Sequence, residues 1–127
     1  MQMRGQREIQ VAGWLVIAAV ILFAATLVEG HAILKESRPA VNGKVPGPDV
    51  PIMLRYNVRI DAKLSKVQLQ YPDNSVHDLT IEAQSSPDTL NSSATGLVPG
   101  QYKIRWQVLA PDGHITRGEV PFTVTGS

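Results

Sequence analysis

Cysteine is absent from this 127-residue sequence, which excludes disulfide bonds, thiolate metal ligands and a cysteine nucleophile. A charge of one sign is also missing, because 12 Lys and Arg residues are balanced by 11 Asp and Glu residues dispersed along the chain. This balance argues against a nucleic acid or an anionic surface as the partner. No glycine-rich phosphate loop is present, and the serines of residues 84–93 have no histidine near them in the sequence. A hydrolase therefore has no support.

The long hydrophobic run of this chain lies at its N-terminus. Residues 1–10 carry Arg4 and Arg7 against Glu8, and residues 11–28 are uncharged and almost entirely apolar. This layout is typical of a secretory signal peptide and predicts export. The run is longer than the roughly 7–15 residues usual in such peptides and reaches the lower limit of a membrane-spanning helix, about 17–18 residues. An uncleaved membrane anchor is therefore an alternative.

Two cleavage sites satisfy the need of signal peptidases for small residues. Cleavage after Gly30 uses Val28 and Gly30 at the two selected positions and makes His31 the first residue of the mature chain. Cleavage after Ala32 uses Gly30 and Ala32 and removes His31. The small-residue rule does not separate the two sites. We expect residues 1–30 to be the signal peptide and residues 31–127 to form one small domain.

Apolar and polar residues alternate with a period of two along much of residues 50–125, which predicts half-buried β-strands. The predicted inward residues of three of these strands are Ile52, Leu54, Tyr56, Val58 and Ile60; Tyr102, Ile104, Trp106 and Val108; and Val120, Phe122 and Val124. Residues 31–38, 66–71 and 76–82 predict three more strands. Residues 42–51 and 84–94 are rich in turn-forming and small polar residues and predict loops.

Six or seven short strands, with no useful helical period after residue 30, predict an all-β fold. We expect an immunoglobulin-like Greek-key β-sandwich of about seven antiparallel strands, preceded by an N-terminal signal helix. Pro121 cannot donate a ladder hydrogen bond, so the last strand should lie at a sheet edge or turn that position to solvent. The pattern leaves the order of the strands open.

The triplet Asp112-Gly113-His114 carries the strongest chemical signal of the domain. In an extended segment, Asp112 and His114 project to the same side. A mature N-terminal His31 would add its α-amine and one ring nitrogen, and three nitrogens with one carboxylate oxygen in a plane suit Cu(II). Zn(II) would prefer a tetrahedral arrangement. The plain alternative is that Asp112 only caps a Pro-Asp-Gly turn and that His114 begins a strand.

Two other residues have simpler interpretations. His77, beside Asp78 on a short strand, has no chelating neighbour and is expected at the surface. Trp106 is expected in the core, with a place in the wall of the metal site as the alternative.

Residues 31–40 and 97–124 resemble the CopC-type periplasmic copper-binding proteins. The first segment matches an opening His followed by an apolar pair and Ser-x-Pro-Ala, and the second matches Leu-x-Pro-Gly-x-Tyr…Trp…Asp-Gly-His…Gly…Phe-x-Val. The resemblance implies a β-sandwich that binds one Cu(II) per chain through His31, Asp112 and His114. It also implies a periplasmic role in copper resistance, homeostasis or delivery without enzymatic activity, often beside a CopD-type membrane partner, and it favours cleavage before His31.

The sequence departs from that family in two places. Met53 is the one methionine after residue 30, so a second, Met-rich Cu(I) site of the kind some members carry lacks ligands. Many members also have an acidic residue two places after an aromatic on the second long strand, where this chain reads Tyr56-Asn57-Val58. If that acid supports the site from outside the ligand set, the affinity or the hydrogen bonding of His31 should differ here.

Two rival functions remain open at this point. A copper oxidase or monooxygenase could use the same amine-plus-imidazole chelation as a histidine brace, although the carboxylate in the ligand plane and the small domain argue against it. A membrane-anchored immunoglobulin-like interaction module without metal would retain residues 1–30 and so would lack the free amine of His31.

Overall fold

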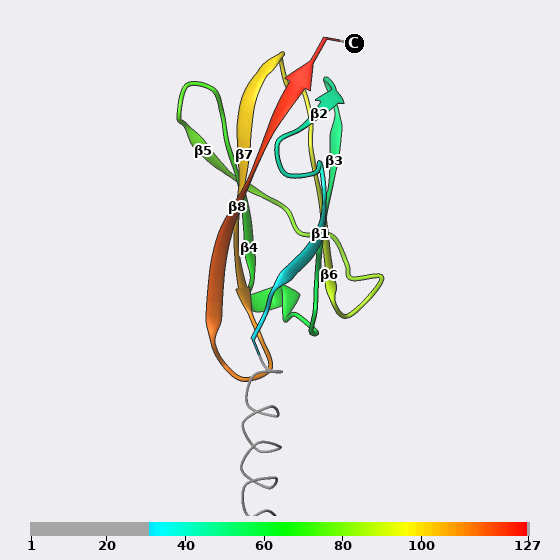
Figure 1. The fold of residues 1–127 in the computed structure, drawn as a ribbon, viewed down its shortest axis with the longest axis vertical. Helices are drawn as coiled ribbons and strands as arrows, with labels where there is room; N and C mark the ends of the chain where they lie inside the picture. The colour runs from blue at the N-terminus through cyan, green and yellow to red at the C-terminus, as the bar shows by residue number, and fades with distance from the viewer. Residues whose placement is uncertain (1–30, 127) are drawn as a thin grey trace, which may run out of the picture. The chain divides into compact units, whose positions relative to one another are not determined.

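The computed structural model describes residues 31–126, which form two β-sheets packed face to face (Figure 1). The strands are β1 (Leu34–Arg38), β2 (Gly43–Pro46), β3 (Val50–Tyr56), β4 (Lys66–Gln70), β5 (Val76–Leu79), β6 (Thr89–Ala94), β7 (Gly100–Leu109) and β8 (Ile115–Thr125). One short 3-10 turn, η1 (Ala62–Leu64), lies between β3 and β4. The smaller sheet has the order β1-β3-β6, and the larger sheet has the order β2-β8-β7-β4-β5. The predicted all-β sandwich is confirmed.

The pairing is antiparallel except at one edge, where β2 runs parallel to the end of β8. Gly43 lies opposite Phe122 and Pro46 opposite Thr125, so β2 covers only the last residues of β8. The described chain thus has eight strands and one parallel pair, where about seven antiparallel strands were expected. Pro121 lies just before this pairing begins, and its carbonyl accepts the Asn42 N–H at 2.7 Å. The N–H and C=O groups of one strand residue point to the same side, so the missing N–H of Pro121 faces away from β7 and costs no ladder bond with it.

The core lies between the two sheets and follows from the period of two. Its fully buried large side chains come from both sheets: Val50, Leu54 and Tyr56 on β3, Leu69 on β4, Leu90 on β6, Tyr102, Ile104 and Val108 on β7, and Val120 and Val124 on β8. At the start of β7, the Tyr102 hydroxyl donates a 2.8 Å hydrogen bond to the Val98 carbonyl. This bond to backbone just upstream resembles the tyrosine corner of immunoglobulin-like sandwiches.

Both predicted loops contain a strand, and in both cases the partner strand explains the error. Residues 42–51 hold β2, which is stabilised by the end of β8 and whose own residues are half-buried or exposed. Residues 84–94 hold β6, whose serines and threonine predict a loop. In the structure β6 pairs with β3 along its whole length, and the buried Ser92 hydroxyl donates to the Thr80 carbonyl at 2.7 Å.

Four strands are shorter than the sequence predicted. The first begins at Leu34 instead of His31, and the second ends at Tyr56 instead of Ile60. The strand β4 ends at Gln70 instead of Tyr71, and β5 ends at Leu79 instead of Glu82. Ile60 is buried as predicted, although it reaches the core from a loop. The predicted signal helix lies outside the described residues. Within residues 31–126 no helix is long and apolar enough to cross a membrane.

Candidate metal centre

The turn between β7 and β8 holds two of the three predicted ligands. The Gly113 N–H donates to the Ala110 carbonyl at 3.0 Å, and the Ala110 N–H donates to the His114 carbonyl at 3.1 Å. Gly113 has a φ of 84°, a backbone conformation that glycine adopts without strain. Pro111 opens the turn with the φ that this position needs. The sequence Pro-Asp-Gly therefore closes a tight hairpin that aims the Asp112 and His114 side chains.

Asp112 caps this turn and contacts the His114 ring at the same time. Its Oδ1 accepts the His114 main-chain N–H at 3.0 Å, and its Oδ2 lies 2.9 Å from His114 Nδ1. The prediction that the two side chains converge because the segment is extended is wrong, since convergence comes from the turn. The His114 main-chain N–H, followed by the His114 ring, holds the pKa of Asp112 below its usual range. Asp112 is therefore an anion at neutral pH.

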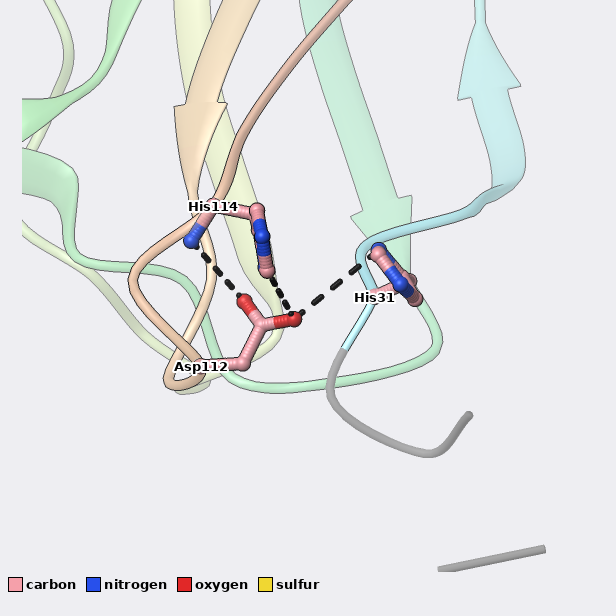
Figure 2. A group of neighbouring side chains, drawn as sticks. All are labelled: His31, Asp112 and His114. Atoms are coloured by element: carbon pink, nitrogen blue, oxygen red, sulfur yellow. Dashed lines mark hydrogen bonds and ion pairs between the residues drawn. The ribbon is translucent and has the colours of Figure 1, made fainter. Parts of the chain in front are cut away.

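His31 reaches this turn from the other end of the domain sequence, just before β1. Figure 2 shows its ring beside the Asp112 carboxylate, with His31 Nδ1 3.8 Å from Asp112 Oδ2. The rings of His31 and His114 stack with centroids 5.2 Å apart and planes inclined by 29°. The neighbouring Ala32 is only 4% exposed and belongs to the core. The three residues predicted from the sequence therefore lie together.

The spacing of the donor atoms suits one metal ion. One ligand atom from each of His31, Asp112 and His114 lies within 4.8 Å of the other two. Atoms bound to one ion at ~2.0–2.1 Å lie about 2.9 Å apart when adjacent in a square plane and about 4.1 Å apart when opposite. The 2.9 Å and 3.8 Å separations from Asp112 Oδ2 approach these two values. The 2.9 Å separation is also the hydrogen-bond distance between Asp112 Oδ2 and His114 Nδ1, and the three donor atoms lie close enough together to be candidate ligands of one ion.

The candidate ligands are open to solvent to different degrees. The His31 and His114 side chains are 55% and 68% exposed, whereas the Asp112 side chain is 22% exposed. A metal held here could be reached from outside the domain. In the 127-residue chain the main-chain nitrogen of His31 is part of a peptide bond. It becomes a fourth donor only when cleavage makes His31 the first residue.

The other candidates stay apart from this group. His77 is exposed on β5, where its ring packs edge-on against Tyr71 at 4.6 Å and its Nε2 lies 3.2 Å from the Ser75 hydroxyl. Trp106 is 8% exposed in the core, as predicted, and its ring makes an edge-to-face contact with Tyr56.

Sequence reasoning missed the contacts that hold the segment preceding β1. Asn57, noted there only as a departure from a family pattern, accepts a hydrogen bond from the Ile33 main chain. The burial of Ala32 was also missed, since no period is visible in so short a segment.

Comparison with known proteins gives one family. The model of the CopC domain matches residues 34–125. Protein YobA of Escherichia coli K12 is 29% identical over 97 residues, which cover 74% of this chain and 78% of YobA, and YobA of Shigella flexneri matches equally.

Two solved structures share the fold. CopC from Methylosinus trichosporium OB3b aligns with a TM-score of 0.70 and 24% identity, over 76% of this chain and 95% of that one. PcoC from Escherichia coli, described as a methionine rich copper resistance protein, aligns with a TM-score of 0.64 and 24% identity, over 75% of this chain and 99% of that one.

Proposed function

This chain belongs to the CopC family, and on that premise we propose that it is a periplasmic Cu(II)-binding protein for copper resistance, homeostasis or delivery. One Cu(II) per chain is held by His31, Asp112 and His114. The observation that carries the proposal is that one candidate ligand atom from each of these residues, which come from two distant parts of the sequence, lies within 4.8 Å of the other two. PcoC, which shares the fold, is described as a copper resistance protein.

The donor set favours Cu(II) over Cu(I). Imidazole nitrogens, an amine and a carboxylate oxygen suit a tetragonal divalent ion, and Cu(II) binds such ligands most tightly among the first-row divalent metals. Cu(I) prefers thiolate and thioether sulfur. Cysteine is absent and Met53, half-buried on β3, is the one methionine after residue 30. A single Cu(II) site is therefore the function that these residues support.

The buried Ala32 favours cleavage after Gly30. Cleavage after Ala32 would remove His31 and also a side chain that belongs to the core. Cleavage after Gly30 keeps Ala32 in the core and frees the His31 amine for chelation. Export and metal binding are then linked, because the site is completed only when the signal peptide is removed.

The exposure of the two histidines suits a carrier. Both rings are more than half exposed, so a partner's ligands could displace them one at a time. We expect copper to pass to or from another periplasmic copper protein or a CopD-type membrane transporter, without catalysis by this domain.

The test is a Cu(II) titration of the exported protein, followed by electron paramagnetic resonance. We expect one equivalent to bind with a tetragonal, nitrogen-rich spectrum. His114→Ala should weaken binding and change the spectrum, whereas His77→Ala should do neither, because His77 lies on β5 outside the group. Wild-type protein without such a spectrum, or equal binding by wild type and His114→Ala, would overturn the proposal.

A further inference from the structure

Asn57 makes two hydrogen bonds to one residue of the segment that carries His31. The Ile33 main-chain N–H donates to Asn57 Oδ1 at 2.7 Å. The Asn57 main-chain N–H donates to the Ile33 carbonyl at 3.0 Å. Both main-chain polar groups of Ile33 are therefore used by a single residue, which directly follows the buried Tyr56 at the end of β3.

The segment from His31 to Ile33, here called the N-terminal arm, needs such a contact. The ladder between β1 and β3 starts at the pair Leu34–Tyr56 and is irregular between Leu34 and Glu36. Chain ends fray unless they are tied down. Within the arm, the His31 and Ile33 residues are exposed and Ala32 is buried. The Ala32 side chain and the Asn57 bonds therefore determine where the arm lies.

The position of the arm decides whether His31 faces the other ligands. His31 Nδ1 lies 3.8 Å from Asp112 Oδ2, and the His31 ring stacks on the His114 ring. Asp112 and His114 are held by their own turn and do not depend on the arm. A site assembled from one rigid turn and one chain end loses affinity when the chain end is free to move, because ordering it then opposes binding.

We propose that Asn57 is the positioning residue of the metal centre, which holds the N-terminal arm so that His31 faces Asp112 before the metal arrives. This inference rests on the proposed function for its effect on copper, but the position of the arm is a property of the metal-free protein. Asn57 acts through its side-chain oxygen on the Ile33 N–H and is not itself a ligand.

Three variants test the proposal. Asn57→Ala removes the acceptor, and Asn57→Asp retains an acceptor oxygen at the same place. Asp49→Ala is the matched control, because Asp49 lies just before β3, at the opposite end of the strand from Asn57, and its Oδ1 likewise accepts a main-chain N–H, that of Gly96 at 3.3 Å. The control thus removes the same kind of bond outside the metal centre.

The first measurement is amide hydrogen exchange of the exported, metal-free protein by nuclear magnetic resonance. The Ile33 amide should be protected in wild type, in Asn57→Asp and in Asp49→Ala, and should exchange freely in Asn57→Ala. Unchanged protection in Asn57→Ala would overturn the proposal whether or not the protein binds copper.

The second measurement is the Cu(II) dissociation constant by competition with a chelator. Asn57→Ala should raise it on the order of two- to tenfold, the range expected from one exposed neutral hydrogen bond. Asn57→Asp should keep most of the wild-type affinity for Cu(II), and Asp49→Ala should leave that affinity unchanged. If wild type binds Cu(II) and Asn57→Ala binds equally well, the positioning role fails while the proposed function stands. If wild type binds no Cu(II), the proposed function fails, and the Ile33 exchange still decides whether Asn57 holds the arm.

Discussion

Gly118 on β8 lies directly opposite Trp106 on β7, and replacing it with alanine should strain the core. A Cβ atom at Gly118 would lie 2.2 Å from Trp106 Cζ2 and 2.6 Å from Trp106 Cε2, far inside contact distance. The indole is buried, so it cannot turn out to solvent to make room. The ring must therefore shift, or β7 and β8 must separate.

The expected cost follows from two opposing terms. Overpacking a dense core costs ~1–3 kcal/mol, and a rigid ring this close places Gly118→Ala at the upper end. Replacing glycine by alanine returns about 0.4–1 kcal/mol by restricting the unfolded chain. The net loss should be about 2 kcal/mol, which lowers the melting temperature of a domain of this size by roughly 8–16 °C. Thermal unfolding of the exported protein, followed by circular dichroism, measures this shift.

Two comparisons isolate the cause. Gly126→Ala should not lower the melting temperature, because a Cβ there would meet nothing within 4 Å. Trp106→Phe replaces the two fused rings of the indole with one ring and removes Cζ2. In this background Gly118→Ala should cost at least ~1 kcal/mol less than in wild type, a coupling typical of residues in contact. An equal cost in both backgrounds, or no cost in wild type, would refute the reasoning.

Three further predictions concern single side chains. Tyr56→Phe removes a buried hydroxyl that has no hydrogen-bond partner among residues 31–126, so the melting temperature at pH 7 should stay or rise. Burial raises the pKa of Tyr56 well above its usual range. Above about pH 10 the unfolded tyrosine ionises, so the free energy of unfolding of wild type should fall by up to ~1.4 kcal/mol per pH unit. Unfolding series from pH 8 to 11 should show this loss in wild type and not in Tyr56→Phe. Gly113→Ala places a side chain at φ 84° and should cost about 1 kcal/mol by thermal unfolding. The pKa of Asp112 is lowered in the folded protein, so wild type should be more stable than Asp112→Asn above about pH 4. This difference in the free energy of unfolding should vanish as pH falls through the folded-state pKa. Unfolding of both proteins from pH 7 to 2 measures it.

The strands that were predicted well are those whose burial is visible in the local pattern. On β7, Tyr102, Ile104, Trp106 and Val108 alternate with exposed or half-exposed residues, and all four are buried. The strand β6 was missed because its stability comes from pairing with β3 and from a hydrogen bond of Ser92 to Thr80. Such partners are distant in the sequence, so the local alternation of apolar and polar residues does not reveal them.

The candidate metal centre likewise has a part that the local sequence predicts and a part that it does not. Asp112 and His114 share one turn, so their proximity could be predicted from the triplet alone, although the turn and not a strand brings them together. His31 was joined to them from the chelating chemistry of an N-terminal histidine and supported by the resemblance to a known family, because nothing local ties the start of the domain to the turn between β7 and β8. The bonds of Asn57 to Ile33 became visible only in the folded chain.

The free amine of His31 is the central claim, and one comparison of two proteins tests it most directly. The exported protein that begins at His31 should be titrated with Cu(II) beside the same protein with its N-terminal amine acetylated. Loss of a residue that only hydrogen-bonds to a metal ligand costs roughly 10–100-fold in metal affinity, so loss of a direct ligand should cost at least as much. We expect the acetylated protein to bind Cu(II) more weakly by that factor and its paramagnetic resonance spectrum to show one nitrogen ligand fewer. Equal affinity and identical spectra of the two proteins would contradict the account.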